Sequence, residues 1–494
     1  MDREPKAQAR RWRAFAVLAV SFFMTVVDLT IVNVALPTIG RGLHFSESNL
    51  QWIVTAYAIT FGGFLLLGGR AADLLGRRRI LMAGLAVFTA ASLAAGLATS
   101  DGLLIAMRGL QGFGAAVVLP AALSIVMNMF AEGAERNKAL GLWGGIGAAG
   151  ATIGVVTGGL VTRYLGWEYI FFLNVPIGIA ALLLAPRLVP ESRLDTARRR
   201  FDPLGAVTVT GGLLVLVYAL SKAPQDGWGS ARTVTLLAAS AALLAAFLVV
   251  EARAGAPLMP LRIFRLRTVA AANAVGLLLG GSFFAFIFIC TLYMQQVLGY
   301  SALQTGVAWL AATVTSVALA GLSQRLVTRL SPGPVMALGM VLIGGGALWA
   351  TQAPVHGHFW SALAGPFFVA GAGTAFAFIP VSIAGLAGVA GREAGLASGL
   401  LNTSQQLGGA IGVAIASTVA ATHLKTLAGE GKAANVALTG GFHWALWVCG
   451  AIALLALPTT VVLLRRKAPA TSAGQEGTAL DDDAHPVLEG DRAR

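Results

Sequence analysis

The sequence predicts an all-α polytopic membrane protein with 14 transmembrane helices, and three observations support this class. Of its 494 residues, 56% are hydrophobic and only 12% are charged, about half the charged fraction of an ordinary soluble domain. Fourteen stretches are each long and apolar enough to cross a bilayer, which takes about 20 residues. Lys and Arg gather in every second connection between these stretches, which is typical of a protein threaded back and forth through a membrane.

The predicted spans follow one another with mostly short connections. The first is too long for the apolar core of a cleaved signal peptide and is followed by further apolar stretches, so we interpret it as a retained helix. The spans begin near Ala14, Gln51, Ile80, Gly102, Ala139, Tyr169, Leu204, Val234, Ala270, Thr305, Pro334, Trp360, Asn402 and Gly441.

The basic residues orient these helices. If the N-terminus is cytoplasmic, 28 Lys and Arg fall in cytoplasmic segments, six fall in external loops and Arg108 lies within a span, which accounts for all 35. Because basic loops are retained in the cytoplasm, we expect both termini to lie there. The same bias explains the net charge of +13, so we expect the bilayer, and no nucleic acid, as the partner of the basic residues.

A weak repeat divides the chain. Gly69 to Arg79, after the second span, and Gly321 to Arg329, after the tenth, share the spacing of a glycine and a basic residue, although Arg325 replaces Asp73. Membrane proteins built from two such halves hold their sites between them. We expect a cytoplasmic N-terminal segment, a six-helix half, a cytoplasmic linker, two inserted helices, a second six-helix half and a disordered cytoplasmic tail, at residues 1–13, 14–190, 191–203, 204–253, 254–466 and 467–494.

Five stretches carry a family resemblance. The loop from Gly69 to Arg79 resembles the signature loop of the major facilitator superfamily. The stretches Asp28–Pro37, Arg108–Gly114, Gly166–Gly178 and Gly399–Gly409 resemble motifs of its fourteen-helix drug:proton antiporters. This resemblance implies a monomeric transporter in a bacterial-type plasma membrane that exports hydrophobic or amphipathic small molecules by alternating access. Protons would be the coupling ion, with no other cofactor.

Two departures from the family pattern bear on direction. The fifth-helix motif of the antiporters has a proline where this chain has Val155, and Glu168 stands where the family usually has Arg. The missing proline weakens the sign most associated with export. An uncoupled facilitator or an importer of the same superfamily is therefore the alternative, and a membrane-embedded enzyme is a more distant one.

Asp28 is the only acidic residue well inside a predicted span. A charge at the centre of a bilayer costs about 2.5–3.5 kcal/mol, so such a residue is expected to have a function. Since removal from water favours the neutral form of a carboxyl group, a buried carboxyl can bind and release protons. Asp28 and Arg108 lie about 12 Å and about 9 Å from the outer ends of their helices. We predict that they form a proton-coupling pair, with a permanent structural ion pair as the alternative.

The signature loop is expected on the cytoplasmic side. By resemblance, Gly69, Asp73, Gly76, Arg77 and Arg78 form a conformational latch, with Asp73 against the N-terminus of a helix of the second half. A merely topogenic role of the arginines is the alternative.

The fifth span contains glycines at four-residue spacing. Small residues on one face allow helices to approach closely and slide. A role in gating and a role in close packing alone are both open for Gly150, Gly154, Gly158 and Gly159.

The interior offers few polar side chains besides aromatic ones, which suits hydrophobic or amphipathic substrates. The candidates for the substrate cavity are Asn33, Tyr57, Trp143, Tyr293, Gln295, Trp309, Asn402 and Gln405. No cluster of metal ligands or nucleophiles and no phosphate-binding glycine loop ending in Lys-Ser or Lys-Thr occurs in the sequence. We therefore expect neither enzymatic activity, nor a metal site, nor ATP as the energy source.

Overall fold

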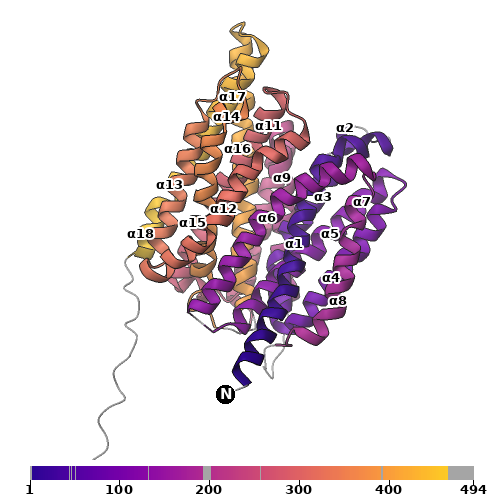
Figure 1. Ribbon diagram of the computed structural model, residues 1–494, viewed down its shortest axis with the longest axis vertical. Coiled ribbons are helices and arrows are strands. Elements are labelled where there is room, and N and C mark those ends of the chain that lie inside the picture. Colours follow the sequence, from indigo (N-terminus) through magenta and orange to yellow (C-terminus); the bar gives the residue numbers. More distant parts are fainter. Residues whose placement is uncertain are drawn as a thin grey trace, which may run out of the picture.

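A computed structural model describes residues 3–43, 45, 47–50, 52–131, 133–192, 202–255, 257–390 and 393–464. Thirteen of its helices are long and apolar enough to cross a membrane. In addition, α6 (Ala134–Tyr164), with 31 residues, lies where the fifth span is predicted. The predicted all-α polytopic class is confirmed, and the helices are arranged as one tall bundle (Figure 1).

The bundle consists of two halves, coloured indigo to magenta and orange to yellow in Figure 1. The first half contains α1 (Arg3–Gly42), α2 (Glu47–Leu50), α3 (Trp52–Leu75), α4 (Arg77–Gly96), α5 (Asp101–Met129), α6, α7 (Tyr169–Phe172) and α8 (Asn174–Leu188). The second half contains α11 (Arg267–Gln296), α12 (Ala302–Leu330), α13 (Pro332–Ala350), α14 (Phe359–Ala362), α15 (Ala364–Leu386), α16 (Ala394–Gly429), α17 (Ala434–Leu454) and α18 (Leu457–Leu464).

The two halves repeat the same helix contacts. In the first half α1 packs against α6 and α8, α3 against α5, and α4 against α5 and α8. In the second half α11 packs against α16 and α17, α12 against α15, and α13 against α15 and α17. The halves meet through two further pairs that correspond to each other, α3 with α16 and α6 with α12. The weak sequence repeat therefore reflects a repeated three-dimensional arrangement.

Two helices are inserted between the halves, α9 (Pro203–Asp226) and α10 (Ala231–Arg253), and the 3-10 helix η1 (Leu261–Arg265) leads from them into α11. Helix α9 packs against α3 and α16, whereas α10 packs mainly against α9. Only 17% of the apolar window of α10 is buried, so this helix lies at the edge of the bundle with most of its surface toward the surrounding lipid.

Several helices extend beyond the predicted spans. Helix α16 begins at Ala394 rather than near Asn402 because Asp73 accepts hydrogen bonds from the backbone N–H groups of Gly395 and Leu396, which supplies partners for the first turn. At its other end α16 runs to Gly429, and its 36 residues give a length of about 54 Å. The hairpin of α16 and α17 therefore projects beyond the rest of the bundle at the top of Figure 1.

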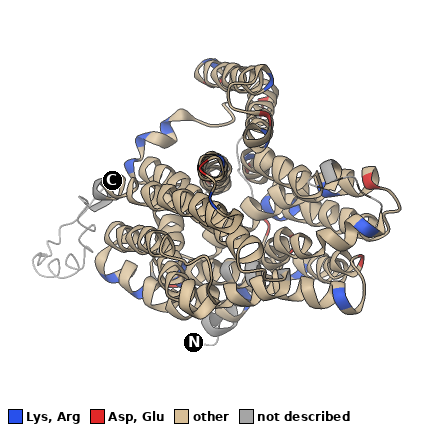
Figure 2. Cartoon of the chain, turned by 90° about the horizontal axis from the view of Figure 1, so that it is seen from above, with Lys and Arg blue, Asp and Glu red and all other residues tan. Residues whose placement is uncertain are grey.

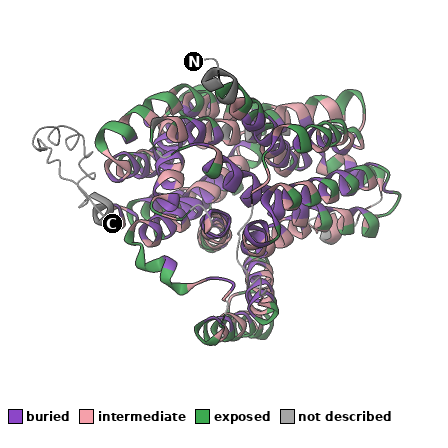
Figure 3. Ribbon diagram, turned by 90° about the horizontal axis from the view of Figure 1, so that it is seen from below, coloured by how far each residue is buried: buried purple, intermediate pink, exposed green. Residues whose placement is uncertain are grey.

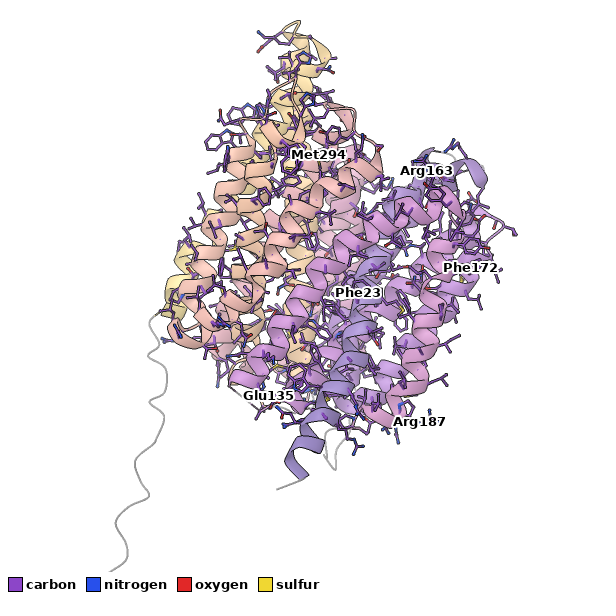
Figure 4. The ribbon with its side chains drawn as sticks, viewed as in Figure 1. Phe23, Glu135, Arg163, Phe172, Arg187 and Met294 are labelled. Carbon is purple, nitrogen blue, oxygen red and sulfur yellow. The ribbon has the colours of Figure 1, made fainter. Side chains whose placement is uncertain are left out.

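Charge and burial follow the pattern expected in a bilayer. Charged residues are sparse along the helices in Figure 2, and buried residues line the helix faces that meet inside the bundle in Figure 3. Figure 4 places Arg187 at the end where the N-terminus lies and Arg163 at the opposite end, in agreement with their predicted sides. The predicted tail 467–494 and most of the predicted linker 191–203 lie outside the described residues, and the domain boundaries stay predictions.

Candidate functional site

Asp28 lies at the centre of a buried polar network in the first half. Its Oδ2 atom is 2.6 Å from Arg108 Nη1 on α5. Its Oδ1 atom accepts hydrogen bonds from Gln111 Nε2 on α5, at 3.1 Å, and from Asn174 Nδ2 on α8, at 2.8 Å. All four side chains are at most 1% exposed. The carboxylate is thus paired and hydrogen-bonded on both oxygens, which is how proteins accommodate a buried charge.

Arg108 is held from several directions. Its Nε donates to the carbonyl of Ile53 at 3.1 Å, and its Nη1 also donates to Gln111 Oε1 at 3.0 Å. The guanidinium stacks over the ring of Tyr57, with 4.4 Å between Cζ and the ring centroid. Gln111 in turn donates to Ser92 Oγ at 2.7 Å. Since Arg108 keeps two neutral acceptors, it can remain solvated by the protein when its contact with Asp28 is weakened.

A proton on Asp28 would change the contacts that join several helices of the first half. A proton on one carboxylate oxygen removes the negative charge that Arg108 neutralises and replaces an acceptor by a donor. The partners of Asp28 and Arg108 come from α3, α5 and α8, so this network joins α1 to three other helices of the first half. This is the chemistry that a proton-coupled membrane protein needs.

Sequence reasoning singled out Asp28, Arg108 and Tyr57, and the structure brings these three together. It did not assign roles to Gln111 and Asn174, although both lie in stretches that resemble family motifs. A single Asn or Gln in a sequence does not reveal its partner, because its amide group can bond to water or to a backbone carbonyl as readily as to a buried charge. Its position on the same buried face as a charge is visible only in three dimensions.

The signature loop joins the two halves at the end of the bundle where the N-terminus lies. Asp73 Oδ1 accepts from Gly395 N at 3.1 Å and Oδ2 from Leu396 N at 2.8 Å, at the N-terminus of α16, where the helix dipole favours a negative charge. Arg77 Nη2 lies 2.6 Å from Asp73 Oδ1, and both side chains are almost fully buried. Asp73 thus occupies the position that a latch requires, and its role in the transport cycle stays a prediction.

The remaining loop residues hold this arrangement in place. A side chain on Gly69 would overlap the carbonyl of Gly395, so glycine allows α3 and α16 to cross closely. Gly76 adopts φ +111, a conformation that other residues rarely accept. Arg78 donates to the carbonyls of Pro186 and Val189, each at 3.2 Å, which ties the loop to the end of α8.

The connection between α10 and α11 is also bonded to the signature loop region, through Arg70. Arg70 Nη2 donates to the carbonyl of Pro257 at 3.0 Å. Glu251 accepts from the backbone N–H groups of Leu258 and Met259 at 3.1 and 3.0 Å, which folds the connection back on the inserted pair. The inserted helices are therefore anchored beside the signature loop.

The glycines of α6 lie on two faces. Gly150, Gly154 and Gly158 face α1, where a side chain on Gly154 would overlap Thr30 and approach the Val27 carbonyl to 2.8 Å. Gly159 instead faces Leu303 of α12 in the second half. The first three allow close contact with the helix that carries Asp28, and the fourth lies at the junction between the halves.

The substrate-cavity candidates of the first half are differently placed. Tyr57 is buried against Arg108, and the ring of Trp143 stacks on Phe22 with 4.3 Å between centroids. Asn33 is exposed and makes only a 3.4 Å hydrogen bond to Leu29 on its own helix.

Among the candidates of the second half, Tyr293 and Trp309 form hydrogen bonds to other residues of that half. Tyr293 is 2% exposed and donates to the Pro354 carbonyl at 2.6 Å. Trp309 donates to Thr291 at 3.2 Å. Gln295 is exposed, and Asn402 and Gln405 are partly buried on α16. The structure therefore does not gather these eight side chains into one site, and their contact with a substrate stays a prediction.

A helical bundle of two repeated halves with a buried ion pair inside one of them defines the general class, a polytopic membrane transporter. Residues 18–413 and, in an overlapping second match, 274–487 fit the Major Facilitator Superfamily. The chain belongs to this family of transporters, which confirms the family resemblance of its motifs and identifies it as a transporter rather than an enzyme.

Several relatives match nearly the whole chain. It is 36% identical to the cephamycin export protein CmcT of Amycolatopsis lactamdurans, over 93% of this chain and 94% of that protein. It is 35% identical to the puromycin resistance protein pur8 of Streptomyces alboniger, over 97% and 95%. The tetracenomycin C resistance and export protein of Streptomyces glaucescens is 33% identical, over 84% and 77%.

Two solved structures share the fold. The human organic anion transporter MFSD10 (TETRAN) superimposes with a TM-score of 0.66 at 15% identity, over 91% of this chain and 99% of the other. The proton:xylose symporter XylE superimposes with a TM-score of 0.63 at 14% identity, over 92% and 96%.

Proposed function

We propose that this chain exports hydrophobic or amphipathic antibiotics or drugs across a bacterial plasma membrane in exchange for protons, as a monomer with both termini in the cytoplasm. The observation that carries proton coupling is the Asp28 carboxylate, fully buried among Arg108, Gln111 and Asn174. Relatives that match most of the chain are named as antibiotic export or resistance proteins. These names support the proposed substrate class and the outward direction.

The packing of α1 supports a route from the proton site to the second half. Helix α6 packs on α1 through Gly154 and Gly158, against Val27, Thr30 and Ile31 on either side of Asp28. The other face of α6 contacts α12, where Val155 packs so closely on Gly306 that a side chain there would overlap it. A shift of α1 when Asp28 gains a proton would therefore be passed through α6 to the second half.

At the other end, Asp73 joins α3 to the N-terminus of α16. These contacts favour a state in which the halves are closed on the side of the N-terminus. Breaking them is required for opening to that side. Proton release and drug binding would alternate with this opening, as alternating access requires.

The proposed exchange is tested with inverted membrane vesicles that hold an established proton gradient, acidic inside. Puromycin, tetracenomycin C or a cephamycin is added, and the gradient is followed with a pH-sensitive dye. Collapse of the gradient by one of these compounds in vesicles with the wild-type chain, and no collapse in vesicles without it, is the expected result. Uptake of the same compound without any proton movement would establish an uncoupled facilitator instead.

The position of Val155 bears on direction, since valine stands where the antiporter motif has proline. In the structure Val155 fills the contact with Gly306, so the junction between α6 and α12 is closely packed without a proline kink. Export is tested by a susceptibility panel in an efflux-deficient host. Raised resistance to at least one of the three compounds supports export, whereas raised sensitivity would establish import.

A further inference from the structure

A basic cavity lies where α1 begins and α8 ends. It measures about 370 Å³ and is lined by Ala9, Arg10 and Arg13 of α1 and by Leu188 of α8. Arg187, the neighbour of Leu188, lies at the same end of the bundle (Figure 4). The cavity lies at the ends of two candidate membrane spans, Gln8–Gly42 and Tyr169–Leu188, where lipid headgroups are expected.

Neither the two arginines that line this cavity nor nearby Arg187 has an acidic partner among the side chains that the structure describes. Arg10, Arg13 and Arg187 are exposed, and none of them belongs to an ion pair within the described part of the chain. By contrast, Arg11, on another face of α1, lies 3.4 Å from Glu135. Two like charges that line one cavity repel each other, and an anion placed between them relieves that repulsion.

An apolar strip continues from the arginines toward the middle of the bundle. Ala16 and Val20 follow Arg13 at the three- and seven-residue spacing of one helix face, and Val20 is 47% exposed. On α8, Leu184 lies one turn before Leu188 and is 43% exposed. Helices α1 and α8 pack against each other, so each helix presents a basic end followed by an exposed apolar surface.

We propose that this cavity binds the phosphate headgroup of an anionic phospholipid of the surrounding leaflet, with its acyl chains along the exposed faces of α1 and α8. Guanidinium groups form bidentate hydrogen bonds with phosphate. Basic pockets between helices at the cytoplasmic side of a bundle suit such headgroups. A free inorganic anion would use the arginines but would leave the apolar strip unused, so the charge and the strip together favour a lipid.

The lipid would cover a junction that matters for transport. Helices α1 and α8 carry Asp28 and Asn174, which are joined by a 2.8 Å hydrogen bond. A lipid bound at the ends of both helices restrains their relative position. The protein is therefore expected to be more resistant to heat when this lipid is present.

The proposal is tested on the full-length protein in detergent, titrated with phosphatidylglycerol, phosphatidylcholine or inorganic phosphate, with binding followed by native mass spectrometry and by thermal unfolding. The variant replaces both cavity arginines (Arg10→Gln, Arg13→Gln). The matched control removes two exposed charges at the opposite end (Lys425→Gln, Lys432→Gln). A third variant (Arg10→Lys, Arg13→Lys) keeps the positive charge that membrane insertion requires.

The wild type and the control variant (Lys425→Gln, Lys432→Gln) are both expected to bind phosphatidylglycerol in preference to phosphatidylcholine. The double Gln variant is expected to lose about five-fold in affinity for each arginine, which corresponds to about 1 kcal/mol each. The Arg→Lys variant should lie between them, and it decides the question if the Gln variant is not inserted. Equal binding of the two lipids by wild type, unchanged binding in both arginine variants, or displacement of the lipid by millimolar inorganic phosphate would overturn the proposal.

Discussion

At the level of single residues, the buried network of the first half combines a strong charge pair with neutral amide donors. Asp28 has one partner that carries a charge, Arg108, and two that do not, Gln111 and Asn174. The charged partner neutralises the carboxylate inside the bundle. The neutral partners orient the carboxyl group by two further hydrogen bonds, from Gln111 and Asn174.

Replacing Asp28 by Asn is expected to abolish drug-induced proton movement in inverted vesicles, because the only titratable carboxyl of the network is removed. The protein should still be present at normal abundance, since Arg108 keeps the Ile53 carbonyl and Gln111 Oε1 as acceptors. The control is Asp226→Asn, which alters a carboxylate paired with Arg232 at 3.4 Å outside the network. Normal coupled efflux by Asp28→Asn would remove Asp28 from the mechanism.

Replacing Asn174 by Ala is expected to lower the free energy of unfolding by about 1–3 kcal/mol, since it takes one donor from a buried carboxylate. Thermal unfolding in detergent measures the effect. Asn33→Ala provides the comparison, because Asn33 is exposed and makes one long hydrogen bond within its own helix; its effect should stay within about 0.5 kcal/mol. Equal effects of the two substitutions would show that the Asn174 hydrogen bond contributes little.

At the level of helices, the contact between α1 and α6 depends on small residues next to Asp28. The glycine face of α6 lies against the turn of α1 that contains Val27, Thr30 and Ile31. Because the two backbones are this close, a small movement of α1 cannot be absorbed by flexible side chains. The contact therefore tolerates little added volume, and in the proposed cycle it would pass a displacement of α1 on to α6.

Gly154→Ala is expected to destabilise the protein by about 1–3 kcal/mol, since the new methyl group would overlap Thr30 and lie 2.8 Å from the Val27 carbonyl. Gly321→Ala is the matched control on α12, where nothing lies within 4 Å of the added methyl. That control should be neutral or slightly stabilising, because alanine favours a helix. Thermal unfolding and drug transport are measured for both. A Gly154→Ala protein as stable and active as the control would contradict the close contact.

At the level of the whole molecule, a buried carboxylate adds hydrogen bonds to the packing of α3 on α16 at the end where the N-terminus lies. Asp73 connects α3 of the first half to the first turn of α16. The partly exposed pair of Arg262 and Glu393, at 2.8 Å, instead ties η1 to the start of α16. That pair does not bridge the two halves, and a partly exposed ion pair contributes about 1 kcal/mol or less. The buried carboxylate, with two backbone donors and Arg77, is the stronger restraint on opening.

Asp73→Asn is therefore expected to weaken the closed state and to speed hydrogen exchange at the amides of Gly395 and Leu396, measured by mass spectrometry on the whole protein. Asp101→Asn provides the control, since Asp101 lies at the N-terminus of α5 and bonds only within the first half, to Gly102 and Asn49. Unchanged exchange at the start of α16 in Asp73→Asn would show that the two halves are held together by other contacts.

The sequence predicted the features that depend on local composition. Hydropathy placed the spans, and a count along the helices placed Asp28 and Arg108 at similar depth; their atoms lie 2.6 Å apart. It could not predict that α16 begins at Ala394, because the residue that satisfies its first N–H groups, Asp73, is more than 300 positions away. Gln111 and Asn174 were missed for the same reason: their common partner lies on a third helix.

The long hairpin of α16 and α17 also has a practical consequence. Its two helices extend beyond the bundle and contact each other through the stacked rings of His423 and Trp444, whose centroids are 4.5 Å apart. The hairpin ends in an exposed turn around Gly431. A 50.8 kDa protein enclosed in a lipid particle offers few landmarks for aligning electron micrographs. An antibody fragment raised against this turn would provide such a landmark at a distance from the Asp28 network and the signature loop.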